Sequence, residues 1–250
     1  MQSLINKTAI ITGASSGIGK AAARLFAQHG ARLIVNGRRA DELDALCAEI
    51  RAEGGLAIAV VGDVAHESLQ QQMVELAEKE FGGLDIAFNN AGTLGLAKAT
   101  TDVTADEWQA VLNTNLNAAF LAAKYQLPAM QRRGSGSLLF TSSFVGHTAA
   151  FPGLAAYAAS KAGLIGLTQA LAVEYGPQKI RVNCLLPGGT ETGMLQEFNA
   201  TAEALAPMFA LKRIAQASEI AQAALFLASD AASFVTGTAM LVDGGVSIQR

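Results

Sequence analysis

The sequence contains few cysteines, few prolines and few charged side chains for its 250 residues. Its two cysteines, Cys47 and Cys184, lie far apart with no histidine or second cysteine close by. This spacing excludes a disulfide scaffold and a cysteine-based metal cluster, so we expect no metal. We interpret both thiols as small buried apolar side chains and expect a reducing, cytoplasmic location.

Charge is also scarce, because charged residues make up 16% of the chain against about 25% in ordinary globular proteins. The 18 basic and 21 acidic residues leave a net charge of −3, which argues against nucleic acid as the main partner. No uncharged apolar run reaches the ~18 residues of a membrane span. Residues 1–7 lack the basic region and apolar core of a signal peptide. We therefore expect neither a membrane nor a nucleic-acid partner.

Hydrophobic residues, by contrast, make up 51% of the chain and are spread along its length. Short apolar runs, which we predict as strands, alternate with longer segments of helical spacing. The strands are expected at residues 8–12, 33–35, 56–61, 84–88, 138–141, 181–185 and 239–242. The helices are expected at residues 17–28, 40–53, 67–81, 105–132, 155–175 and 219–228.

This alternation predicts an α/β fold, a doubly wound parallel sheet with helices on both faces. The strands are continuous apolar runs, as expected where both faces of a sheet are covered. No break in composition marks a second domain, so we expect one domain over residues 1–250. The irregular stretch at residues 188–216 is typical of a substrate lid or binding loop.

A glycine-rich turn follows the first predicted strand. Gly13 permits a sharp turn, Gly17 lets backbone N–H groups approach a pyrophosphate, and Gly19 permits close packing of helix on strand. The following helix N-terminus favours an anion. A tight turn that binds nothing is the alternative, but the position directly after the first strand favours a cofactor. The intervening residues of this candidate site are Ser15, Ser16 and Ile18.

Two arginines, Arg38 and Arg39, stand at the end of the second predicted strand, where NAD-binding folds tend to place an acid. A guanidinium suits a 2′-phosphate, which it grips through two hydrogen bonds. We therefore favour NADP(H), with NAD(H) possible, and the alternative is a solvated basic turn. Asp63, which precedes Val64 after the third strand, is either an acceptor for the adenine amine or an ordinary loop aspartate.

A second group of candidates suits proton transfer. Tyr157 and Lys161 are four residues apart, on one face of a predicted helix. An ammonium close to a phenol lowers the phenol pKa from ~10 and makes it a proton donor and acceptor. Ser143 follows the fifth strand and suits a hydrogen bond to a substrate carbonyl, or else a turn. Asn115 lies inside a predicted helix, where an amide is mildly unfavourable, so it is either functional or a core amide.

In this order and spacing, the motifs resemble those of the short-chain dehydrogenase/reductase family from Thr12 to Gly245. The motifs are Thr12-Gly13-x-x-x-Gly17-x-Gly19, Asn89-Asn90-Ala91-Gly92, Asn115, Ser143, Tyr157-x-x-x-Lys161, Pro187-Gly188 and Asp243-Gly244-Gly245. The resemblance implies a Rossmann-type domain with a seven-stranded sheet. Family members usually form tetramers through the two long helices, which implies a homotetramer here.

The resemblance also implies roles for individual residues. Tyr157 would be the general acid/base, Ser143 would polarise the substrate carbonyl, Lys161 would hold the nicotinamide ribose, and Asn115 would hold a water of a proton relay. Further cofactor-site residues would be Asn89, Ala91, Gly92, Pro187, Gly188, Thr190 and Thr192, the last as the anchor of the carboxamide. Two features depart from the family. Ser143 precedes Tyr157 by fourteen residues where thirteen is commoner, and Thr190 stands where an aliphatic residue is frequent.

These residues predict an NADP(H)-dependent carbonyl or 3-oxoacyl-type reductase that interconverts a small ketone and a secondary alcohol. A polyol or sugar dehydrogenase is the alternative. A non-catalytic nucleotide sensor is disfavoured because Ser143, Tyr157 and Lys161 are all present. An apolar substrate pocket is expected from residues 93–96, Phe144, His147, Phe151, Met194, Leu195, Phe198, Leu205 and Met208. For His147, a loop position facing solvent is the alternative.

Overall fold

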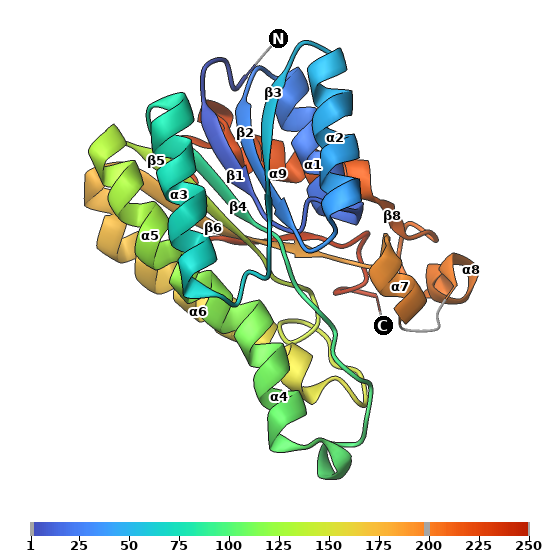
Figure 1. The fold of residues 1–250 in the computed structure, drawn as a ribbon. Coiled ribbons are helices and arrows are strands. Elements are labelled where there is room, and N and C mark those ends of the chain that lie inside the picture. Colours follow the sequence, from blue (N-terminus) through green and yellow to red (C-terminus); the bar gives the residue numbers. More distant parts are fainter. Residues whose placement is uncertain (1–2, 198–200, 250) are drawn as a thin grey trace.

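The computed structural model describes residues 3–197 and 201–249, and in these residues seven strands form one parallel sheet. The strand order is β3-β2-β1-β4-β5-β6-β9, so the chain starts in the middle and winds outward in both directions (Figure 1). The strands are β1 (Thr8–Ile11), β2 (Arg32–Gly37), β3 (Leu56–Val61), β4 (Ile86–Asn89), β5 (Gly136–Thr141), β6 (Ile180–Pro187) and β9 (Ala239–Val242).

Helices cover both faces of this sheet (Figure 1). One face packs against α1 (Gly17–Gln28), α2 (Ala40–Ala52) and α9 (Ala217–Ala228). The other face packs against α3 (Glu67–Phe81), α5 (Ala118–Arg133) and α6 (Ala155–Tyr175). The prediction of a doubly wound α/β fold from the alternating sequence pattern is confirmed.

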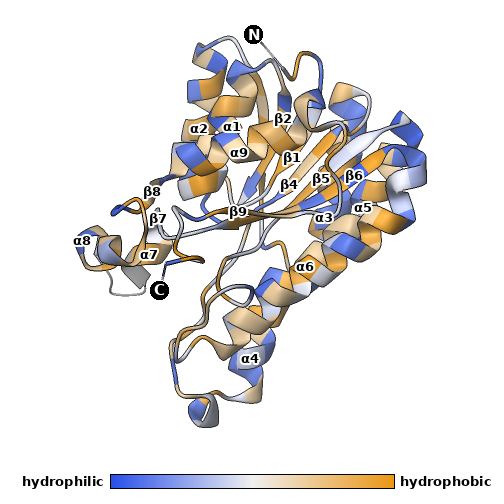
Figure 2. Cartoon of the chain, turned by 180° about the vertical axis from the view of Figure 1, so that it is seen from behind, coloured by the Kyte–Doolittle hydropathy of each residue, from blue (hydrophilic) through white to orange (hydrophobic). Residues whose placement is uncertain are grey.

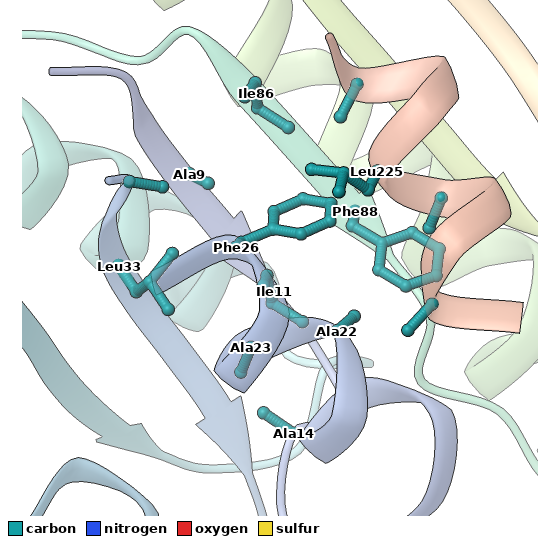
Figure 3. Packing of buried hydrophobic residues seen from close by; sticks show 14 of the residues in the cluster. Ala9, Ile11, Ala14, Ala22, Ala23, Phe26, Leu33, Ile86, Phe88 and Leu225 are labelled. Atoms are coloured by element: carbon teal, nitrogen blue, oxygen red, sulfur yellow. The ribbon is translucent and has the colours of Figure 1, made fainter. Parts of the chain in front are cut away.

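The two faces share strands because successive strand residues point to opposite sides. Ile11 of β1 faces α1, whereas Ile10 belongs to the core under α3 and α5. Figure 3 shows Phe26 of α1 meeting Phe88 of β4 and Leu225 of α9. Phe26 is fully buried, and truncating such a side chain to alanine costs about 3–5 kcal/mol.

The distribution of hydropathy follows this layering. In Figure 2 the strands are coloured mostly as hydrophobic, while the helices carry hydrophilic residues on their outer faces. The strands therefore read as apolar runs and the helices as amphipathic segments. Among the described residues, no helix has both the length and the apolar character of a membrane span.

The long helix predicted over residues 105–132 is helical throughout, but it contains a π-helical turn that the sequence did not predict. The structure has α4 (Ala105–Leu112), a π-helical turn (Asn113–Asn117) and then α5. Thr104 and Glu107 begin α4 with a capping box. From the end of α5, α4 continues beyond the carboxyl edge of the sheet (Figure 1).

The stretch predicted as irregular also contains short elements. They are β7 (Thr190–Glu191), α7 (Gly193–Glu197), α8 (Ala202–Leu205) and β8 (Ala215–Gln216), and β7 pairs with β8. This pairing holds the ends of the segment together, so that α7 and α8 stand as a lobe opposite α4 (Figure 1).

Candidate active site

A cleft of about 640 Å³ runs along the carboxyl ends of the strands. Its walls include the residues that follow β1, β2, β3, β4, β5 and β6. In parallel sheets these ends all lie at one edge, which is where open α/β folds bind ligands. The sequence motifs, which are far apart along the chain, are therefore brought together by the sheet.

The glycine-rich turn forms one end of this cleft. Gly13 has a φ of +68°, which favours glycine, and a Cβ on Gly19 would lie 2.3 Å from the Gly13 carbonyl oxygen. The expected sharp turn and close helix packing are thus confirmed. Ser16, the N-cap of α1, makes no side-chain cap hydrogen bond, and the first turn has no acidic residue. The first N–H groups of α1 therefore suit a bound anion.

Both arginines after β2 line the same end of the cleft. Arg39 Nη2 donates to Ser15 Oγ at 3.1 Å, which ties the β2 end to the glycine turn. Arg38 is exposed and forms no ion pair within the described part of the chain. Asp63 and Val64 line this end too, and Asp63 Oδ1 accepts from the Ala65 N–H at 2.9 Å. Two guanidinium groups thus stand close to the helix N-terminus of α1.

The remaining predicted cofactor residues fall into two groups. The structure brings Ser16, Gly17, Ile18, Ala91, Gly92, Pro187, Gly188, Thr190 and Thr192 into the cleft wall. Asn89 does not line the cleft, contrary to the prediction. Its Nδ2 donates to Gln126 Oε1 at 2.8 Å, and its Oδ1 accepts from Gln126 Nε2 at 3.1 Å. Its neighbour Asn90 lines the cleft instead and donates from Nδ2 to the Thr12 carbonyl at 3.2 Å. Since side chains alternate along a strand, only one of two adjacent asparagines can face the glycine turn.

Ser143, Tyr157 and Lys161 meet at the middle of the cleft. All three are buried, with exposed fractions of 5%, 7% and 3%. Tyr157 and Lys161 project from successive turns of α6, and Lys161 Nζ lies 5.6 Å from the centre of the Tyr157 ring. Lys161 Nζ also donates to the Thr141 carbonyl of β5 at 2.7 Å. The sheet and α6 therefore bring together a phenol, an ammonium and a hydroxyl.

Burial dominates the proton affinity of this group. It raises the pKa of Tyr157, and hydrogen bonding with the Ser143 hydroxyl opposes that rise. The pKa of Tyr157 is therefore raised and not lowered as expected, because burial removes water from the phenolate. Burial also lowers the pKa of Lys161 to about 8. Near neutral pH the phenol holds its proton and the amine remains mostly charged.

Asn115 lies in the π-helical turn and is 3% exposed. Its Oδ1 accepts from the Thr93 N–H at 2.8 Å, and its Nδ2 donates to the Thr93 carbonyl at 2.9 Å and to Ser160 Oγ at 2.9 Å. These bonds join the loop after β4 to α6, on which the phenol and the ammonium stand. Asn115 is thus a buried amide with its hydrogen bonds satisfied, and it joins the loop after β4 to the helix that carries Tyr157 and Lys161.

The opposite end of the cleft is mostly apolar. Phe144 and Phe151 form an edge-to-face pair with ring centres 6.0 Å apart. The other expected residues that line this end are Thr93, Leu94, Gly95, Leu96, Met194, Leu195, Leu205 and Met208. The prediction that His147 lines the substrate pocket is wrong, because this side chain is exposed and does not line the cleft. The alternative, a loop position facing solvent, applies. Phe198 lies outside the described residues.

The contribution of α4 to this apolar end was not predicted from the sequence. Val111, Ala110 and Glu107 line the cleft, and Val111 is 5% exposed. Val111 precedes Asn115 by four residues, so helical spacing alone puts both on one face. That spacing was the available signal. Leu154 and Phe209, which also line the cleft, follow from loop packing and had no such signal.

The fold and this cleft define a Rossmann-type α/β protein with a site for a long ligand. A family model described as Enoyl-(Acyl carrier protein) reductase matches residues 13–247. The chain is 39% identical to a cyclohexanol dehydrogenase of Acinetobacter sp. (strain SE19), over 96% of this chain and 94% of the relative. The chain belongs to the short-chain dehydrogenase/reductase family, whose members are oxidoreductases of alcohol and carbonyl groups.

Two solved structures are similar over almost their whole length. A short-chain type dehydrogenase/reductase from Mycobacterium marinum has a TM-score of 0.94 at 35% identity, covering 99% of this chain and 98% of that one. A short chain dehydrogenase from Burkholderia cenocepacia J2315, solved in complex with NADP, has a TM-score of 0.91 at 34% identity. That alignment covers 98% of this chain and 99% of the neighbour. The family resemblance inferred from the motifs is confirmed.

Proposed function

We propose that the protein interconverts a small apolar ketone and its secondary alcohol with NADP(H). The observation that carries this proposal is the meeting of Ser143, Tyr157 and Lys161 in the middle of one cleft, between a glycine-rich turn and an apolar end. A nucleotide sensor would not need a buried phenol and a buried ammonium, both of which are costly. Titratable groups with shifted pKa values in a cleft are typical of catalytic sites.

The cofactor assignment is supported by the shape and charge of the glycine end. A Cβ on Gly17 would lie 2.9 Å from Thr192 Cγ2, so the turn leaves space only because glycine is there. The uncapped N-terminus of α1 would hold the pyrophosphate, and Arg38 and Arg39 would hold a 2′-phosphate. Asp63, Val64, Ala91, Gly92, Pro187, Gly188, Thr190 and Thr192 would complete the site. NADP(H), when bound, supplies or accepts the hydride.

The protein residues handle the proton and the substrate oxygen. During reduction, the Tyr157 phenol donates its proton to the carbonyl oxygen, and Ser143 Oγ donates a hydrogen bond to the same oxygen. The raised pKa of Tyr157 keeps this proton in place until the oxygen gains negative charge. Lys161 would bind the ribose and stabilise the phenolate that remains. In the oxidation direction, that phenolate takes the proton from the alcohol.

The substrate class follows from the apolar end of the cleft. The carboxylate of Glu107 at this end is already paired, since it forms an ion pair with Lys98 and caps α4. The lid sequence over residues 193–208 contains two glutamates and no lysine or arginine. These features favour a neutral aliphatic, alicyclic or aryl ketone over a sugar, a polyol or a phosphorylated carrier thioester. The relative named as a cyclohexanol dehydrogenase fits this class.

The direct test is the loss of NADPH absorbance with a panel of carbonyl compounds. We expect turnover with cyclohexanone or an aryl ketone, and kcat/KM at least about tenfold lower with a 3-oxoacyl coenzyme A thioester or a ketose. Higher kcat/KM for the thioester would contradict the substrate class. No turnover with any carbonyl or alcohol, with NADP(H) or NAD(H), would contradict the enzyme assignment.

We further propose a homotetramer that buries the outer faces of α5 and α6. Phe120 of α5 is 55% exposed and Val173 of α6 is 81% exposed, which is high for large apolar side chains. Light scattering should give four times the 25.8 kDa chain mass. Replacing Phe120 with Lys should dissociate the assembly, and a wild-type monomer would contradict this proposal.

A further inference from the structure

A buried glutamine behind the proposed catalytic group has an unsatisfied oxygen. Gln70 lies on α3 and is 1% exposed. Its Nε2 donates to the Val64 carbonyl at 2.8 Å, which fixes the amide. Its Oε1 has no hydrogen-bond partner in residues 3–197 and 201–249. Since a buried acceptor without a partner is destabilising, we expect a hydrogen-bond donor next to Gln70 Oε1.

Gln70 also lines a small cavity of about 10 Å³. A space of about this size is just enough for one water, which is held in proteins by two to four polar groups. The polar residues that share the cavity wall with Gln70 are Thr12, Asn89, Thr114, Asn115 and Thr141. Both conditions for a bound water, volume and polar partners, are therefore met.

The walls of this cavity hold the reacting groups in place. Thr141 gives its carbonyl oxygen to Lys161 Nζ, and Asn115 joins the loop after β4 to α6. On the other side, Asn89 pairs with Gln126 of α5. A water in the cavity would thus complete a polar connection from α3 to the residues that position the ammonium.

We propose that Gln70 is a positioning residue that holds one water in this cavity and through it supports Lys161 and Asn115. The kinetic consequence rests on the proposed function, whereas the water itself does not. Without the water, Lys161 lies in drier surroundings. Tyr157 and Cys184 are the titratable groups that face Lys161 in the described chain, and both stay in place. Less hydration lowers the pKa of Lys161. The charged ammonium, and with it the activity, should therefore be lost at a lower pH.

The experiment compares Gln70→Met with Gln71→Met. Gln71 is the neighbouring glutamine on α3, and its exposed side chain donates to Glu75, so it is a matched control. A crystal structure of the wild-type protein with NADP⁺ should show a water within about 3.2 Å of Gln70 Oε1. Gln70→Met should lose this water, lower the Tm by about 2–4 °C and lower kcat about tenfold. In the pH–rate profile of Gln70→Met, the fall in kcat at high pH should begin about half a pH unit lower than in the wild type.

Three results would overturn the inference. The first is a wild-type crystal structure in which Gln70 Oε1 contacts no water, which needs no variant. The second is a Gln70→Met protein as stable as the wild type, because this variant should lose both the water and the Nε2 bond to the Val64 carbonyl. The third is a Gln70→Met protein that has lost the water but keeps the kcat and the pH profile of the wild type, because Gln70 would then have only a structural role. If the wild type has no redox activity, the proposed function fails, but the water and Tm measurements still decide the binding site.

Discussion

The two ends of the cleft are built in different ways. At the cofactor end, the wall is formed by strand ends, by the glycine turn and by the first N–H groups of α1. At the substrate end, it is formed by apolar side chains from α4, from the loop after β5 and from the lid. Figure 1 shows the difference, since β1 to β3 lie inside the layered body while α4 and the α7–α8 lobe extend beyond it.

This difference determines what a substitution does. The backbone forms the cofactor end, so an added Cβ or a reversed charge there should disturb binding of the dinucleotide. Side-chain volume forms the substrate end, so substitutions there should change which ketone fits and leave the cofactor bound. The proposed catalytic group lies between the two ends, where burial shifts the pKa values of Tyr157 and Lys161.

Lys161→Met should separate activity from stability. We expect turnover to fall at least about 100-fold. Burial lowers the Lys161 pKa from 10.5 to about 8, which costs the fold about 3 kcal/mol. Losing the bond to the Thr141 carbonyl offsets about 1–2 kcal/mol of this gain. The variant should therefore have a Tm about 2–8 °C higher than the wild type.

The stability that Lys161→Met gains over the wild type should decrease as the pH rises above about 8. Below pH 8 the ammonium is charged in both the folded and the unfolded chain, so the cost of burying it is fully present. Between about pH 8 and 10.5 only the unfolded chain keeps the proton, and the difference from Lys161→Met should shrink. Lys79→Met, at a side chain 78% exposed, is the control and should not change the Tm. Calorimetry that finds Lys161→Met less stable at pH 7 would contradict the burial argument.

Arg38→Asp should change the cofactor preference. Loss of a charge-assisted bond to the 2′-phosphate is worth about 1.5–3 kcal/mol, which predicts a fall of roughly 10–150-fold in kcat/KM for NADPH. The values for NADH should stay equal or rise. Arg51→Asp, at the exposed last turn of α2, serves as the control. Competition kinetics with unchanged selectivity for NADPH would refute the role of Arg38.

Gly19→Ala should weaken the cofactor end through its backbone. The new Cβ would meet the Gly13 carbonyl oxygen, and such overpacking costs about 1–3 kcal/mol. We expect a lower Tm and a Kd for NADPH raised several-fold by fluorescence titration. Gly166→Ala on α6 is the matched change for cofactor binding, because Gly166 does not line the cleft and a Cβ there meets nothing of its own chain within 4 Å. That variant should leave the Kd for NADPH unchanged, and equal changes of Kd in the two variants would contradict the role of the glycine turn.

Val111→Ala should give the smallest effect, confined to the substrate end. Removing two buried carbons weakens binding of a bulky ketone by about 1–2 kcal/mol, so its KM should rise about 5–30-fold. The Kd for NADPH should stay unchanged. Leu56→Ala, at a 55% exposed position at the start of β3, is the control. A raised Kd for NADPH in Val111→Ala would show that the two ends are not independent.

The sequence predicted the cofactor end better than the substrate end for a physical reason. Backbone turns require glycine, so Gly13, Gly17 and Gly19 leave a visible pattern, whereas apolar side chains in loops resemble any core residue. The π-helical turn at residues 113–117 was not predicted because no proline or glycine marks it. It is held by the bonds of Asn115 to Thr93 and Ser160, which are distant in sequence. The strands β7 and β8 have two residues each and depend on tertiary pairing.

The adjacent asparagines show a second limit. The motif places both Asn89 and Asn90 after β4, but only the register of the strand decides that Asn90 faces the glycine turn. A one-residue difference in where the strand ends reverses the assignment. The position of His147 was predicted wrongly for a related reason. Backbone hydrogen bonds within its loop turn the chain at this point, and the sequence shows no sign of them.

The most direct test of the account is turnover and NADPH binding measured on the same preparation of Tyr157→Phe. Tyr157 is buried between both ends, and phenylalanine removes only the hydroxyl that holds the proton. We expect kcat for ketone reduction to fall about 10²–10⁴-fold, with the Kd for NADPH within about twofold of the wild-type value. Retained turnover, or loss of NADPH binding together with turnover, would contradict the role of Tyr157 as the proton donor.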